Sequence, residues 1–111
     1  MKNQLNLTDL LTIIQQRISS QDEGSYVKNL HNQGVEKIAQ KIGEEAVEVV
    51  IASLLLNNNL PITQNSSPKL KQDLINEFCD LFFHSLILMA QNNITLEEIY
   101  SEFYQRNIKN K

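Results

Sequence analysis

Four carboxylates at helical spacing are the residues of this sequence best suited to chemistry. Glu45 and Glu48 are three positions apart, and so are Glu77 and Asp80. This spacing places two side chains about 60° apart on one helix face, because each residue turns an α-helix by ~100°. Two helices that each present such a pair can converge on a divalent cation such as Mg²⁺, which prefers oxygen ligands. We therefore predict a metal site built from these four residues.

The alternative for such acids is an ordinary solvated helix surface. Their neighbours argue against it, since Glu48 lies between Val47 and Val49–Ile51, and Asp80 is followed by Leu81–Phe83. A carboxylate in apolar surroundings is costly unless it is paired or bound to a metal. Clustered carboxylates also raise one another's pKa when no cation is present. Both arguments favour metal binding over the surface interpretation.

Three further charged residues extend the predicted site along the same helix. Glu44 lies about 100° from Glu45, where it could orient the metal ligands or act as the base for an attacking water. Its alternative is a salt bridge to Lys37 or Lys41. These two lysines are four positions apart on the face of Glu45, and we expect them to hold a phosphate. Their alternative is an ion pair with Glu45 one turn later.

His84 and Cys79 complete the list of candidate side chains. His84 follows Asp80 by four positions. We expect it to contact a metal-binding carboxylate rather than the metal, the alternative being a hydrogen-bonded core histidine. Cys79 is the only cysteine, which excludes an internal disulfide and a cysteine metal site, and we expect a small buried side chain there.

Apolar periodicity and capping residues predict that five helices position these groups. The expected ranges are about Thr8–Gln21, Ser25–Leu30, Val35–Asn57, Pro68–Gln91 and Thr95–Arg106. The expected boundary residues are Thr8, Ser25, Ser67 and a Thr95–Glu98 capping box at helix starts, Gly34 and Asn92–Asn93 at helix ends. No strand pattern, repeat or linker interrupts this series, so we predict an all-α bundle.

The third predicted helix also indicates an oligomer. From Ala46 to Leu56 it is apolar nearly all round. A helix that is apolar on every side is normally buried on every side, which one small domain cannot easily achieve. We therefore expect the helical bundle to be completed by a second copy of the chain, as a homodimer.

Composition bounds the remaining possibilities. The 111 residues suit a single domain spanning 1–111. The net charge of −3 provides no bulk basic field for nucleic acid. The longest apolar stretch, 78–90, contains charged and polar residues and is too short to span ~30 Å of hydrocarbon. With an amphipathic start instead of a signal peptide, we expect a cytoplasmic protein that binds neither nucleic acid nor membrane.

The motifs that carry these residues resemble one family over about residues 8–106. The run QGVEKIAQKIGEEAVEVVIA at 33–52 and the run EFCDLFFH at 77–84 are similar to its two main motifs, and Gly24-Ser25-Tyr26 and Arg106 to two smaller ones. The family is phosphoribosyl-ATP pyrophosphatase, within the MazG-like all-α nucleotide pyrophosphatases. Two positions depart from the family's usual residues, Val27 where it has Thr and Phe83 where it has Tyr, so neither is assigned a polar role.

The resemblance implies hydrolysis of 1-(5-phosphoribosyl)-ATP to 1-(5-phosphoribosyl)-AMP and pyrophosphate, the second step of histidine biosynthesis. It implies a Mg²⁺-dependent homodimer, with Mn²⁺ as a possible substitute, and it adds Arg106 to the residues expected to contact phosphate. The cyclohydrolase that acts next is expected to be a separate chain. Two alternatives stay open. One is a MazG-like house-cleaning pyrophosphatase acting on (d)NTPs, and the other is a helical dimerisation module without enzymatic activity.

Overall fold

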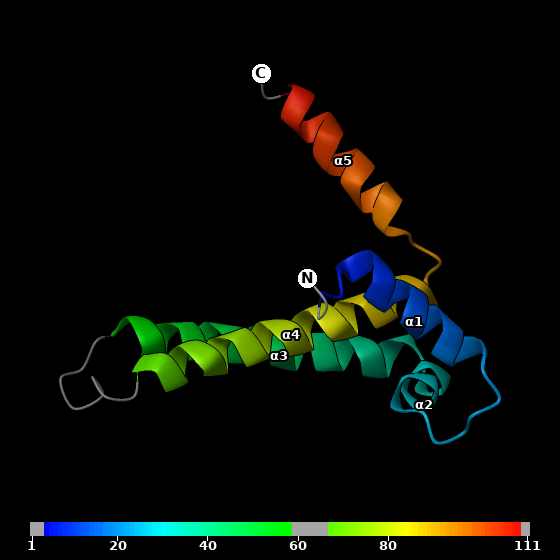
Figure 1. Ribbon diagram of the computed structural model, residues 1–111, viewed down its shortest axis with the longest axis horizontal. Helices are drawn as coiled ribbons and strands as arrows, with labels where there is room; N and C mark the ends of the chain where they lie inside the picture. Colours follow the sequence, from blue (N-terminus) through cyan, green and yellow to red (C-terminus); the bar gives the residue numbers. More distant parts are fainter. Residues whose placement is uncertain (1–3, 59–66, 110–111) are drawn as a thin grey trace.

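The computed structural model describes residues 4–58 and 67–109. Those residues form five helices and contain no strand, which confirms the all-α prediction (Figure 1). The helices are α1 (Leu7–Ser19), α2 (Tyr26–Gln33), α3 (Val35–Asn57), α4 (Ser67–Gln91) and α5 (Leu96–Lys109).

The boundaries around α2 and α3 confirm the capping predictions. The side chain of buried Ser25 accepts a hydrogen bond from the backbone N–H of Lys28 at 3.3 Å and so caps α2. Gly34 joins α2 to α3 with φ at 96°, a conformation that a residue with a β-carbon rarely adopts. Helix α3 spans Val35–Asn57, as predicted.

The predicted cap of α1 was wrong, whereas the predicted cap of α5 is confirmed. Asn6, rather than Thr8, caps α1 by accepting from the N–H of Asp9 at 2.8 Å. Helix α4 begins at Ser67, the predicted cap position, and the predicted polar loop before it falls in 59–66, outside the described residues. At α5, the Thr95 hydroxyl accepts from the N–H of Glu98 at 3.1 Å, and the Glu98 carboxylate accepts from the N–H of Thr95 at 2.8 Å.

Helices α3 and α4 form a long antiparallel hairpin, and the shorter helices gather at one end of it (Figure 1). There α1 packs against α4 and α2 packs against α3. The buried core lies at this junction and is contributed by every helix: Leu11, Ile14, Val27, Leu30, Ile38, Leu86, Ile87 and Leu96. The rest of the hairpin is a pair of helices without a third layer, while α5 projects away from the other four (Figure 1).

The apolar stretch of α3 is exposed in the single chain. Val47, Val50, Ile51 and Leu54 are each more than half exposed, and Phe78 and Phe82 of α4 are 40% and 48% exposed. Helix α5 adds Phe103, Tyr104 and Ile108. The prediction that one chain cannot bury this helix therefore agrees with the exposure of its side chains. Within the described ranges, none of the helices is long and apolar enough to cross a membrane.

Candidate active site on the α3–α4 hairpin

The four predicted metal ligands lie on the facing helices α3 and α4 but differ in burial. Glu45 is 8% exposed, Glu77 is half-buried, and Glu48 and Asp80 are exposed. Glu48 and Asp80, whose apolar sequence neighbours argued against an ordinary solvated surface, are thus accessible to solvent in the single chain. Those neighbours, Phe78 and Val47 among them, are themselves exposed.

The carboxylates interact electrostatically across the hairpin. The pKa of Glu77 is raised above its ordinary value of 4.5, first by partial burial and then by the negative charges of Glu48, Asp80 and Glu45. Burial also raises the pKa of Glu45, an effect opposed by His84 and Lys41 and reinforced by Asp80. Two of the predicted ligands, Glu77 and Glu45, thus have a raised pKa, and neighbouring members of this acidic group of four carboxylates contribute to the rise in both.

The donor set fits Mg²⁺ because it consists of carboxylate oxygens that repel one another and would gain from a shared cation. As the side chains stand, no three His, Cys, Asp or Glu residues within 4–58 and 67–109 are gathered closely enough to hold a metal. A bound cation would therefore have to draw the carboxylates of α3 and α4 together. The side chains of Glu48 and Asp80 are free to make this movement because both are exposed.

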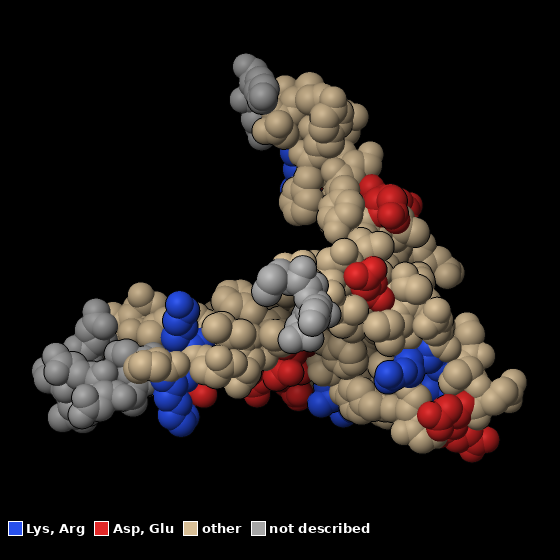
Figure 2. All heavy atoms as spheres, viewed as in Figure 1, with Lys and Arg blue, Asp and Glu red and all other residues tan. Residues whose placement is uncertain are grey.

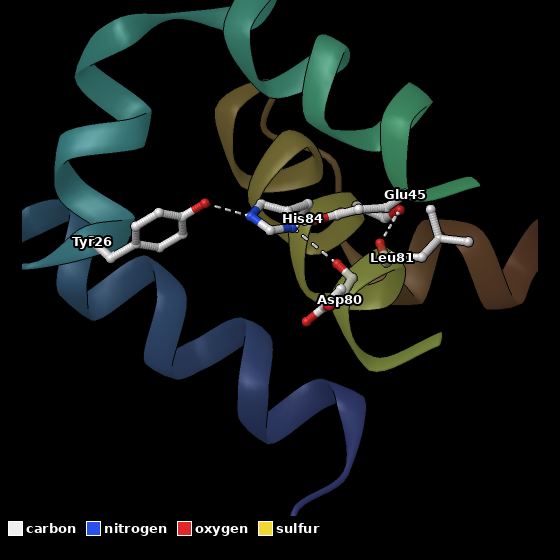
Figure 3. A network of polar contacts seen from close by, with 6 residues as sticks. Tyr26, Glu45, Asp80, Leu81 and His84 are labelled. Carbon is white, nitrogen blue, oxygen red and sulfur yellow. Dashed lines mark hydrogen bonds and ion pairs between the residues drawn. The ribbon is translucent and has the colours of Figure 1, made fainter. Parts of the chain in front are cut away.

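A hydrogen-bond network, buried at Glu45 and His84 and partly buried at Tyr26, joins three helices beside this acidic group (Figure 3). His84 of α4 is 6% exposed, and its Nδ1 lies 2.7 Å from Oε1 of Glu45 in α3. The same nitrogen lies 3.0 Å from the carbonyl oxygen of Asp80, one turn earlier. The other ring nitrogen, Nε2, lies 2.7 Å from the hydroxyl of Tyr26 in α2. His84 therefore forms a hydrogen bond with Glu45, a predicted metal ligand.

The partners of His84 define which ring nitrogen carries the proton. A backbone carbonyl only accepts hydrogen bonds, and so does an ionised carboxylate, so Nδ1 must be the donor to Glu45 and Asp80. In the neutral ring Nε2 is then an acceptor, and the Tyr26 hydroxyl donates to it. The arrangement supports an ionised Glu45 at a position where burial opposes ionisation.

The remaining predicted site residues form no side-chain hydrogen bond with the four predicted metal ligands in the described part of the chain. Lys41 is half-buried and close enough to Glu45 to influence its pKa, which fits the ion-pair alternative as well as the phosphate role. Glu44 is exposed and accepts a hydrogen bond from Gln40 at 3.1 Å rather than from a lysine. Lys37 is half-buried on α3. Cys79 is exposed, so its predicted burial was wrong.

Arg106 is not brought to the carboxylates of its own chain. It lies on the projecting helix α5, where its Nε donates to Glu102 at 3.0 Å. Together with Ile99, Glu102 and Phe103 it lines a shallow pocket of about 160 Å³. A phosphate contact by Arg106 would therefore require a different chain or a different position of α5.

A pocket of about 230 Å³ opens beside the acidic group. Its walls include Glu48 and Glu77, the apolar residues Ile51 and Leu55, and Asp73. Asp73 precedes Glu77 by one helical turn and pairs with Lys69 at 3.1 Å. The sequence analysis did not assign Asp73 to the site, although its i, i+4 spacing to Glu77 continues the same helix face. In Figure 2, acidic side chains gather at the edge of the hairpin, with basic side chains to either side.

Comparison with known proteins identifies related sequences. The family model described as phosphoribosyl-ATP pyrophosphohydrolase matches residues 7–107. A phosphoribosyl-ATP pyrophosphatase of Clostridium acetobutylicum is 41% identical over 97% of this chain and 86% of its own length. One from Saccharolobus solfataricus is 37% identical over 96% of this chain and 98% of its own.

A histidine biosynthesis bifunctional protein, HisIE of Oceanobacillus iheyensis, is 38% identical over 97% of this chain. The match covers 46% of that protein, so the chain spans about half the length of this bifunctional relative. Because the family model and the single-function relatives match nearly the whole chain, the chain belongs to the phosphoribosyl-ATP pyrophosphohydrolase family.

Proposed function

We propose that this chain hydrolyses 1-(5-phosphoribosyl)-ATP to 1-(5-phosphoribosyl)-AMP and pyrophosphate, the second step of histidine biosynthesis. The observation that carries the proposal is the family match over residues 7–107, within which the carboxylate pairs of α3 and α4 lie. Relatives that match most of this chain are named for this activity. A cytoplasmic location is part of the proposal, as the expected place of amino-acid biosynthesis.

In the proposed site, Glu45, Glu48, Glu77 and Asp80 hold Mg²⁺. When bound, this ion would neutralise negative charge on the phosphate oxygens and the departing pyrophosphate. Glu44 is exposed on the adjacent side of α3, where it can orient and deprotonate a water. Oxygen from that water forms the new bond to phosphorus as the α–β anhydride bond breaks, and pyrophosphate leaves. Lys37 and Lys41 balance the remaining phosphate charge.

The direct test is pyrophosphate release from phosphoribosyl-ATP with Mg²⁺, with Mn²⁺ and with a chelator. We expect release with either ion and none with the chelator. A panel of dNTPs tests the house-cleaning alternative, which is favoured if dNTPs are hydrolysed faster than phosphoribosyl-ATP. Calorimetry with Mg²⁺ tests the dimerisation-module alternative, which predicts neither cation binding nor pyrophosphate release.

The proposed enzyme is a homodimer. Support comes from the exposed apolar face of the hairpin, since large contiguous apolar patches on soluble proteins are typical of interfaces. It also comes from α5, whose exposed Phe103 and Tyr104 lie on a helix that projects from its own chain (Figure 1). A second copy would cover both surfaces, and it offers the route by which Arg106 reaches a phosphate.

Replacing Val50 by aspartate is expected to convert the dimer to a monomer. Val50 is 56% exposed on α3, and a buried unpaired charge at an interface is strongly unfavourable. Sedimentation should give twice 12.8 kDa for the unmodified chain and 12.8 kDa for the variant. Gln15→Asp, at an exposed position on α1, is the matched control and should stay dimeric. An unmodified chain that sediments as a monomer contradicts the proposed dimer.

A further inference from the structure

We propose that Tyr26 is a positioning residue for the carboxylate site: its hydroxyl holds His84, and His84 holds the carboxylate of Glu45. The inference rests on the proposed function in assigning Glu45 to cation binding. Tyr26 belongs to α2, whereas the proposed ligands all belong to α3 and α4. Cation affinity would therefore depend on a residue of a third helix that touches neither the cation nor the substrate.

Tyr26 is well placed to hold another side chain in position. It is the first residue of α2, directly after the buried capping residue Ser25, and the next residue, Val27, is 3% exposed in the core. Its ring stacks on Phe83, with 6.4 Å between ring centroids and 19° between ring planes. Tyr26 is 48% exposed, and its hydroxyl projects toward His84 from a capped helix start and from a ring that packs on Phe83 (Figure 3).

The hydroxyl determines the orientation of the His84 ring. Nδ1 is engaged on one side by Glu45 and by the carbonyl of Asp80, and Nε2 is engaged on the other by Tyr26. Rotating the ring by 180° would break all three contacts, so Tyr26 helps to hold the rotamer in which Nδ1–H faces Glu45. The tautomer is set by Glu45 and the carbonyl of Asp80, which only accept hydrogen bonds. Without the Tyr26 hydroxyl, the ring loses the hydrogen bond on its Nε2 side and can turn away from Glu45.

Tyr26→Phe is the decisive variant because it removes only the hydroxyl and keeps the ring that packs on Phe83. We expect its affinity for Mn²⁺, measured by calorimetry without substrate, to fall about three- to ten-fold. This is at or below the low end of the ~10–100-fold losses typical for residues that hydrogen-bond a metal ligand, because Tyr26 acts through His84. At the same fixed pH, ¹⁵N NMR should show faster exchange of the His84 Nδ1 proton with water, because the ring is held less firmly against Glu45. Tyr100→Phe, an exposed position on α5, is the matched control and should change neither quantity.

A double-variant cycle tests whether Tyr26 acts through His84. His84→Asn keeps a donor near the position of Nδ1 but offers nothing at the position of Nε2. In that background Tyr26→Phe should cause no further loss of Mn²⁺ affinity. An equal loss in both backgrounds would overturn the inference, and so would Tyr26→Phe with unchanged Mn²⁺ affinity and unchanged exchange of the Nδ1 proton.

These readouts separate this inference from the proposed function. If the unmodified chain releases no pyrophosphate from phosphoribosyl-ATP but Tyr26→Phe weakens Mn²⁺ binding, the function fails and the positioning role stands. If the unmodified chain is active and Tyr26→Phe binds Mn²⁺ normally, the positioning role fails and the function stands.

Discussion

Replacing Glu77 by glutamine is expected to stabilise the metal-free protein while lowering Mg²⁺-dependent pyrophosphate release by about 100-fold or more. Both effects have one cause. Glu77 is half-buried and faces the charges of Glu48, Asp80 and Glu45, which raise its pKa. Without a cation its ionised form is therefore unfavourable, and a neutral amide of the same shape removes that repulsion. With a cation, the same charge becomes a ligand that glutamine cannot replace.

The stabilising effect should depend on pH in a defined direction. A carboxyl whose pKa is higher in the folded than in the unfolded state binds more protons when folded, so folding stability declines as pH rises through that window. For Glu77 the window begins near its ordinary pKa of 4.5 and extends upward. The advantage of Glu77→Gln should grow as pH rises above 4.5 and disappear below 4.5, where the carboxyl becomes protonated in both the folded and the unfolded state.

Thermal or urea unfolding with chelator, at several pH values, measures the stability of the metal-free protein. Pyrophosphate release with Mg²⁺ measures the loss of turnover. Glu36→Gln is the control, because it removes the same charge from an exposed position in the first turn of α3. It should leave turnover unchanged. Near-native turnover of Glu77→Gln, or a metal-free variant less stable than the unmodified chain, would contradict the assignment of Glu77 to the metal site.

Local signals explain why the helices were predictable. Ser25, Gly34 and the Thr95–Glu98 box act through contacts within a few residues, so their roles follow from sequence neighbours alone. The Thr8 cap was wrong because Asn6, equally suited to capping, stands two positions earlier. Spacing along one helix is local too, so the shared faces of the carboxylate pairs required no knowledge of the fold.

Contacts between helices were predictable only in outline. The sequence indicated that His84 would contact a carboxylate, but which one depends on the packing of α3 on α4, which brings Glu45 to its Nδ1. Tyr26 carried no signal for this role, because 58 positions separate it from His84. The exposure of Cys79 was missed for a related reason. An apolar segment indicates burial, but whether its own chain or a second copy provides that burial is decided by tertiary structure.

Replacing His84 by leucine is expected to cost about 2–4 kcal/mol in the free energy of unfolding, because it leaves the Glu45 carboxylate without its main partner. Glu45 is 8% exposed, so water cannot fully replace the 2.7 Å hydrogen bond from Nδ1. The Tyr26 hydroxyl loses its acceptor in the same variant. Urea unfolding at pH 7 with chelator measures the loss, which is a large fraction of the ~5–15 kcal/mol that stabilises a typical domain.

A second variant distinguishes the unpaired charge from a simple packing defect. Adding Glu45→Leu to His84→Leu removes the buried carboxylate as well, and replacing both members of a buried pair by apolar residues is often neutral or stabilising. The double variant should therefore recover most of the stability that the single variant loses. His31→Leu is the control for the loss of a histidine, since Nδ1 of His31 is buried without a hydrogen-bond partner in the described part of the chain. If the double variant is less stable than His84→Leu alone, the loss comes from packing, and His84 does not act by supporting an ionised Glu45.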